Sequence, residues 1–185
     1  MTILNRRNFA LGAIAGTSLT ACGNGIGSKG PETIDARVQS TLDFMYENYP
    51  GTVDLSAKAA GMLVMPLITE IGLGLGGSFG RGALVIGDTT VDYYSTTSGS
   101  AGLQIGAQQF SHVLFFMTQD ALADFRRSNG WAAGADVEYA INDRGEILRA
   151  ETTTSLSPVI AVVFAQAGLR IGATLEGTKY TRIIP

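Results

Sequence analysis

Few residues of the chain have side chains suited to catalysis. The single histidine, His112, lies in the apolar segment 111–116, where a hydrogen-bonded core or edge position is expected rather than a general base. No Gly-x-Ser-x-Gly elbow is present to pair with it. Asp136 and Glu138 stand two apart on a predicted strand and could hold a cation or form an acid pair, but a solvated strand face is the simpler interpretation. We therefore predict no catalytic residues, no metal and no cofactor.

The spacing of glycines in Gly72-x-Gly74-x-x-Gly77 matches the dinucleotide-binding fingerprint, but the sequence around it does not. That fingerprint requires a helix directly after it, whereas residues 78–86 have the pattern of a loop and a strand. The formal net charge of −3 argues against nucleic-acid binding, which normally needs a basic surface. Neither a nucleotide nor a nucleic acid is expected as a ligand.

The N-terminus has the layout of an export signal. Arg6 and Arg7 precede an apolar run over 10–21, which is too short to span a bilayer. The run ends in Leu19-Thr20-Ala21-Cys22, which resembles the lipobox of bacterial lipoproteins. This resemblance implies that the chain is cut before Cys22 and that a diacylglyceryl group is attached to the Cys22 thiol. The alternatives are the first helix of a globular domain and a buried, inert cysteine.

The export route stays open. The segment Arg6-Arg7-Asn8-Phe9 resembles a twin-arginine signal, but Asn5 and Ala10 depart from the residues that this signal prefers, so general export is the alternative. Gly23 is not the aspartate that would retain a lipoprotein in the inner membrane. The resemblance therefore implies anchoring on the periplasmic side of the outer membrane, which two or more acyl chains make stable.

Three segments follow from this layout: an export signal over 1–21, a flexible tether over 22–31 and a folded domain over 32–185. The tether is rich in glycine and polar residues, which cannot bury enough surface to order themselves. Without Arg6 and Arg7, eleven of the 13 basic residues remain against 16 acidic residues, a net charge of −5.

Hydrophobic spacing predicts an α+β domain. Apolar residues at steps of three and four predict helices over 33–48 and 54–60, and a third helix fits 119–128. Period-two patterns predict strands over 61–65, 69–77, 81–87, 90–97, 101–109, 111–117, 132–141, 146–153, 159–165, 168–175 and 179–184. We expect a β-rich, antiparallel, barrel-like or strongly curved sheet of about ten strands, with two N-terminal helices and one inserted helix.

Three of these strands carry an unusual number of glycines. The hexapeptides at 102–107 and 168–173 differ at one position, and 72–77 is a looser copy. Alternation along a strand leaves one face of each almost bare, at Gly72, Gly74, Gly76, Gly102, Gly106, Gly168 and Gly172. Tight curvature of the sheet, close approach of another backbone, or room for an acyl chain or another flat ligand would each explain these glycines.

Five segments in order resemble the SYLF domain, also called the Ysc84 actin-binding-like domain. They are Ala57–Pro66, Gly72–Gly82, Gly102–Gln108, Phe125–Trp131 and Gly168–Gly177. The resemblance implies phosphoinositide binding, as in eukaryotic members, or actin bundling, as in fungal members; bacterial members are mostly secreted or lipid-anchored. Lys58 and Arg81 lie within the matching segments, and with Gln104 and Arg170 they are the candidates for lipid binding.

We therefore expect a non-enzymatic, lipid-anchored envelope protein whose domain binds a phospholipid or another amphiphile. Its membrane contact would pass through acylated Cys22, and any protein partner is unknown. The alternative is a structural or protein-interaction lipoprotein without a small ligand. A hydrolase is a third hypothesis, which would require His112 to meet a carboxylate and a hydroxyl in a pocket.

Overall fold

One long β-hairpin forms most of the fold. The computed structural model describes residues 29–134, 137–139, 157–165, 168–169, 175 and 177–185. Strand β1 (Gly61–Ile86) pairs antiparallel with β2 (Thr89–Phe116) from the Gly61–Phe116 pair to the Ile86–Thr89 pair. The two-residue turn between them contains Gly87 with a positive φ of 59°, a conformation that glycine adopts without steric cost.

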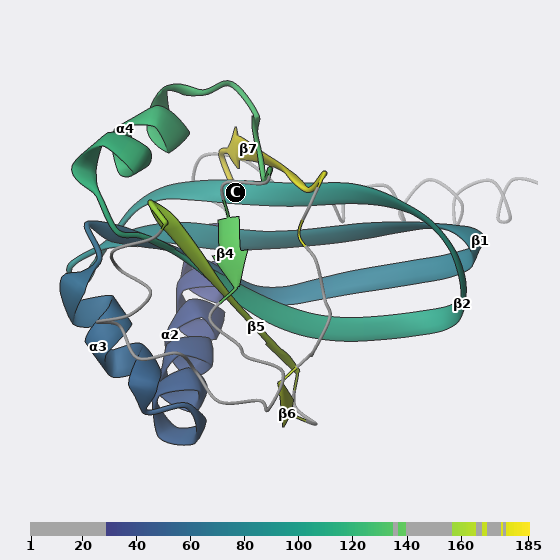
Figure 1. The fold of residues 1–185 in the computed structure, drawn as a ribbon, viewed down its shortest axis with the longest axis horizontal. Helices are drawn as coiled ribbons and strands as arrows, with labels where there is room; N and C mark the ends of the chain where they lie inside the picture. Colours follow the sequence, from purple (N-terminus) through teal and green to yellow (C-terminus); the bar gives the residue numbers. More distant parts are fainter. Residues whose placement is uncertain (1–28, 135–136, 140–156, 166–167, 170–174, 176) are drawn as a thin grey trace, which may run out of the picture.

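The hairpin folds back on itself at its glycine-rich part. Gly72 pairs with Gly106 and Gly74 with Gly102, on either side of an irregularity in register after Leu73. Figure 1 shows both strands turning back at the end of the molecule away from α3 and α4. The structure thus supports curvature as the role of these glycines. Gly106 has a φ of 133° and open space where a Cβ would sit, so close approach does not explain it.

Close approach does occur a few residues along β1. A Cβ on Gly80 would lie 2.7 Å from the Leu67 carbonyl oxygen, and a Cβ on Gly82 would overlap the Val64 carbonyl oxygen. The first and last thirds of one strand therefore press against each other, with no side chain between their backbones at these points. Only glycine permits such an approach.

The prediction of about ten strands is wrong for the described residues, which form a curled sheet of seven. Six predicted strands, from 61–65 to 111–117, are parts of β1 and β2. Hydrogen-bonded pairing continues through the predicted breaks at 78–80, 98–100 and 110, and it resumes at Ile68 after the irregularity that follows Met65. The α+β class, the strong curvature and the three helices are confirmed.

Shorter strands extend the sheet from both halves of β2. Residues 93–97 pair with β7 (Lys179–Ile183), which pairs with β3 (Trp131–Ala132). Residues 111–116 pair with β5 (Val159–Ala165), which is antiparallel to β6 (Gly168–Leu169). The β4 strand (Val137–Tyr139) runs parallel to β5, a departure from the fully antiparallel sheet expected.

Helices cover both sides of the curled sheet (Figure 1). On one side lie α2 (Gly30–Asn48) and α3 (Gly51–Lys58), and on the other lies α4 (Gln119–Arg127). The apolar residues at steps of three and four that predicted this helix are Ile34, Val38, Leu42 and Met45, and all four are buried. Thr118 caps α4 by accepting a hydrogen bond from the Ala121 amide at 3.2 Å.

His112 joins the two halves of the folded hairpin inside the core. It lies on the second half of β2, and its Nε2 is 2.8 Å from the hydroxyl of Tyr180 on β7, which pairs with the first half. Both side chains are almost fully buried. Burial lowers the pKa of His112 to about 3, because a charged imidazolium would lose its hydration there. The expected core role of this histidine is confirmed.

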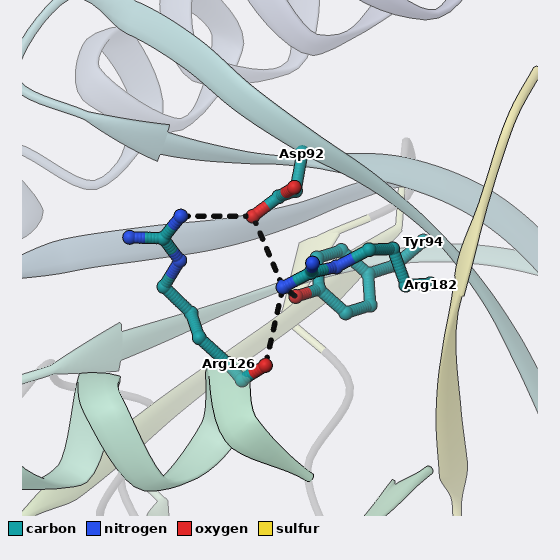
Figure 2. Close-up of polar contacts among 4 residues, drawn as sticks. All are labelled: Asp92, Tyr94, Arg126 and Arg182. Atoms are coloured by element: carbon teal, nitrogen blue, oxygen red, sulfur yellow. Dashed lines mark hydrogen bonds and ion pairs between the residues drawn. The ribbon is translucent and has the colours of Figure 1, made fainter. Parts of the chain in front are cut away.

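A charged cluster fixes α4 to the sheet. Figure 2 shows both guanidinium groups directed at Asp92 on β2, with its Oδ2 3.3 Å from Arg126 Nη2 and 3.4 Å from Arg182 Nη2. Arg182 also donates a hydrogen bond to the Arg126 carbonyl oxygen, 3.1 Å away. Since both arginines are about half exposed, we assign the cluster an orienting role more than a large stabilising one.

Replacing Gly82 with alanine should destabilise the fold. The new Cβ would overlap the Val64 carbonyl and lie 2.6 Å from the Met65 sulfur, and overpacking of this kind costs roughly 1–3 kcal/mol. Urea denaturation of a form that begins at Gly23 measures the change. Gly99→Ala is the matched control, because its Cβ meets nothing within 4 Å. Equal losses in the two variants would contradict the close-approach argument.

Acid should weaken the fold through His112. Between about pH 6.5 and 3 the unfolded chain binds a proton at this residue and the folded chain does not, so stability is full above pH 6.5 and falls as the pH drops. From pH 7 to 5 the free energy of unfolding should fall by about 2 kcal/mol more in the wild type than in His112→Gln. Parallel losses in both proteins, measured by urea denaturation, would refute this assignment.

Candidate functional site

A groove runs along the seam between the first half of α2 and β1. It consists of two adjoining cavities of about 430 and 630 Å³, which share Lys29, Thr33, Arg37, Pro66 and Leu67 in their walls. Phe79, Gly80 and Arg81 extend the first cavity along β1, and Ser40 and Thr41 extend the second along α2. We call this feature the basic groove.

Three basic residues give the groove its charge. They are Lys29 and Arg37 at the start of α2 and Arg81 on β1. Lys29, Thr33 and Arg37 follow one another at steps of four residues, so α2 places all three on one face. The first cavity has no acidic residue in its wall, and the second has Glu32 alone. The N-terminus of α2 also lies here, and its partial positive charge adds to that of the side chains. The groove is therefore suited to a negatively charged group.

Apolar surface lies beside these charges. Leu67 is 37% exposed and Phe79 is 50% exposed, although both are large hydrophobic residues. The Arg81 guanidinium lies 5.9 Å from the centre of the Phe79 ring, within the range of a cation–π contact. A cationic rim next to exposed hydrocarbon matches the two parts of an anionic amphiphile.

The fold-back of β1 builds this site. Leu67 and Arg81 are separated by 14 positions, yet both line the first cavity because the strand returns past Leu67 at Gly80. Ser111 donates a hydrogen bond of 2.7 Å to the Pro66 carbonyl oxygen and holds the irregular segment between Met65 and Ile68. The wall opposite α2 is therefore part of the sheet itself and does not depend on a loop.

Of the predicted lipid-binding residues, the structure places Arg81 in the basic groove. Lys58 is exposed at the end of α3 and is absent from the groove wall. Gln104 lies on β2, in the fold-back. Among the predicted glycines, Gly76 pairs with Ser100, and Gly168 lies in β6. The remaining candidates, Arg6, Arg7, Cys22, Asp136, Arg170 and Gly172, lie outside the described residues.

The sequence analysis missed Lys29, Arg37 and Phe79. Lys29 fell inside the predicted tether, and Arg37 was assigned only to the predicted helix over 33–48. The four-residue spacing of Lys29, Thr33 and Arg37 was the available signal. Nothing in the sequence alone indicated that Phe79 would stay exposed beside Arg81.

The hydrolase hypothesis gains nothing from the position of His112. This residue is 1% exposed and binds a hydroxyl, that of Tyr180, but its Nδ1 has no hydrogen-bond partner in the described part of the chain. A catalytic base must reach a substrate, which such burial prevents. Glu138 lies on β4, opposite Ile160 of β5. The dinucleotide interpretation was correctly rejected, since β1 continues as a strand through Ile86.

Comparison with known proteins supports the resemblance seen in the sequence. Residues 97–182 match the model of the Ysc84 family, which is described as Las17-binding protein actin regulator. A comparison with curated proteins finds no match to the chain. No helix in the described residues has both the length and the hydrophobicity needed to cross a membrane. The matched segment contains most of β2 together with α4 and β3 to β7, and through it the chain belongs to the Ysc84 (SYLF) family.

Proposed function

We propose that this chain is a lipid-anchored cell-envelope protein whose Ysc84-family domain binds a phospholipid or a similar anionic amphiphile without catalysing a reaction. The observation that carries the proposal is the basic groove, in which Lys29, Arg37 and Arg81 line the same cavity as exposed apolar side chains. Cations would pair with a phosphate group, and Leu67 and Phe79 would contact hydrocarbon. The net charge expected after export is −5, so the chain as a whole would repel an anionic ligand. Attraction of such a ligand would therefore depend on this local basic surface.

The position of the groove suits a membrane tether. Lys29 lies in the groove wall, seven residues after Cys22. A fully extended segment of that length reaches about 25 Å. If Cys22 is acylated on the periplasmic side of the outer membrane, the groove stays within reach of lipid headgroups. Export by the twin-arginine or the general route leads to the same arrangement.

A second candidate is a protein-interaction function without a small ligand. The family description names a Las17-binding protein and actin regulator, and this is the observation that favours it. Actin itself does not suit a protein of the bacterial envelope, so the partner would be another envelope component. Lipid binding that depends on the groove residues separates the two candidates.

Arg81→Gln should weaken binding to anionic vesicles. We expect the form beginning at Gly23 to sediment with vesicles containing phosphatidylglycerol, and loss of one basic residue near the surface to reduce the partition coefficient about fivefold. Lys58→Gln is the matched control, since it removes the same charge from an exposed site outside the groove. Equal effects of the two changes, or no sedimentation with any vesicle, would reject the groove as the lipid site.

Cys22 should carry the membrane anchor. Cells that express the full chain should incorporate labelled palmitate into it, and Cys22→Ser should abolish the labelling and leave the leader uncleaved, because the thiol is the acceptor. Mass spectrometry of the mature N-terminus measures both effects. A wild-type protein without label would remove the tether from the proposal while leaving the groove to be tested by the vesicle experiment.

A further inference from the structure

A second cavity lies on another side of α2, and its chemistry is the opposite of that of the basic groove. It has a volume of about 540 Å³ and is enclosed by α2, α3, β1 and the turn between β1 and β2. It shares no wall residue with the basic groove. Asp35 lies in its wall and Arg37 lies in the groove. The two residues are two positions apart, so they project about 160° apart around the helix.

The rim of this cavity is polar and carries only negative charge. Asp35 from α2 and Asp88 from the hairpin turn contribute two carboxylates, and no lysine or arginine lies in the wall. Neither aspartate forms a salt bridge with a described residue. Hydroxyl groups from Ser56 and Thr90 add further hydrogen-bonding capacity. The rim therefore offers acceptors and an uncompensated negative potential.

Asp35 is held in place by its neighbours and keeps capacity for a ligand. Its Oδ1 accepts a hydrogen bond of 3.0 Å from Thr90, and its Oδ2 accepts one of 2.8 Å from Tyr93. Burial, together with the Asp35 hydrogen bond and charge, raises the pKa of Tyr93 to about 12, so the phenol stays a donor at neutral pH. A carboxylate has about four lone-pair sites, which leaves two free for a third party. A half-buried carboxylate without a cation gains from binding one.

The floor of the cavity is apolar. Val38, Leu42, Met62 and Val85 form it, and all four belong to the buried core on this side of the sheet. A bare metal ion or a strongly hydrated cation would gain nothing from such a floor. A short hydrocarbon chain that ends in an ammonium group would use both parts, because the ammonium offers three donors and the chain covers the floor.

We propose that this cavity, between α2, α3 and the β1–β2 turn, binds a small organic ammonium ion that carries an apolar portion. The inference goes beyond the proposed lipid function, since it concerns a different cavity and a ligand of opposite charge. Asp35 and Asp88 hold the ammonium, and the core residues beneath contact the hydrocarbon.

The test is a titration of the ¹⁵N-labelled full-length chain, carrying Cys22→Ser, with n-butylammonium. Binding is monitored through the chemical shifts of the backbone amides. We expect saturable shifts at Asp35, Gln39, Ser56 and Asp88, which lie in the cavity wall. The neutral analogue n-butanol should bind more weakly, and butyrate should not bind. No saturable shift at the cavity, or equal binding of n-butanol, would overturn the proposal.

Variants locate the charge that matters. Asp88→Asn should weaken n-butylammonium binding about fivefold, as expected for loss of one partly exposed ionic contact, and asparagine suits the same turn. Asp54→Asn on α3 is the matched control, because Asp54 is exposed and lies outside the cavity wall. Equal affinity in Asp88→Asn and the wild type would refute the site. Since no lipid is present, the result is independent of the vesicle experiment.

Discussion

The close contact within β1, at Gly80 and Gly82, is the constraint on which the rest of the structure depends. A strand of 26 residues can press its last third against its first only where one backbone lacks side chains. Dispersion forces between the two halves are strong at this distance because little empty space remains. The Tyr180–His112 hydrogen bond joins the two halves of the folded hairpin at a second buried point, between β7 and the second half of β2.

This contact also determines where a ligand could bind. Pro66 and Leu67 precede the fold-back, and Phe79 and Arg81 follow it, so the basic groove exists only in the folded-back hairpin. The proposed lipid site and the stability of the sheet are therefore linked. Any change that opens the contact at Gly82 should disturb the groove wall along with the core.

The helices were predictable, and the number of strands was not. The inward residues of α2 recur at steps of three and four, and burial follows that pattern from Ile34 to Met45. Strand ends were misplaced because the segments 78–80 and 98–100 have the polar, glycine-containing composition of turns, whereas here Ser78 pairs with Ser98 within one continuous hairpin. The Gly80–Leu67 approach could not be foreseen, since it joins segments through space that show no common pattern in the sequence.

The candidate site was predicted only in part. Arg81 was found because it lies within a segment typical of the family, but Lys29 and Arg37 gain meaning only once β1 lies beside α2. The net charge did not reveal the basic groove, since it sums over surfaces that α2 keeps apart. With Arg37 on one side and Asp35 on another, this single helix separates a basic groove from an acidic cavity. Local charge, set by helical spacing, therefore describes the two proposed binding sites better than the net charge of the chain does.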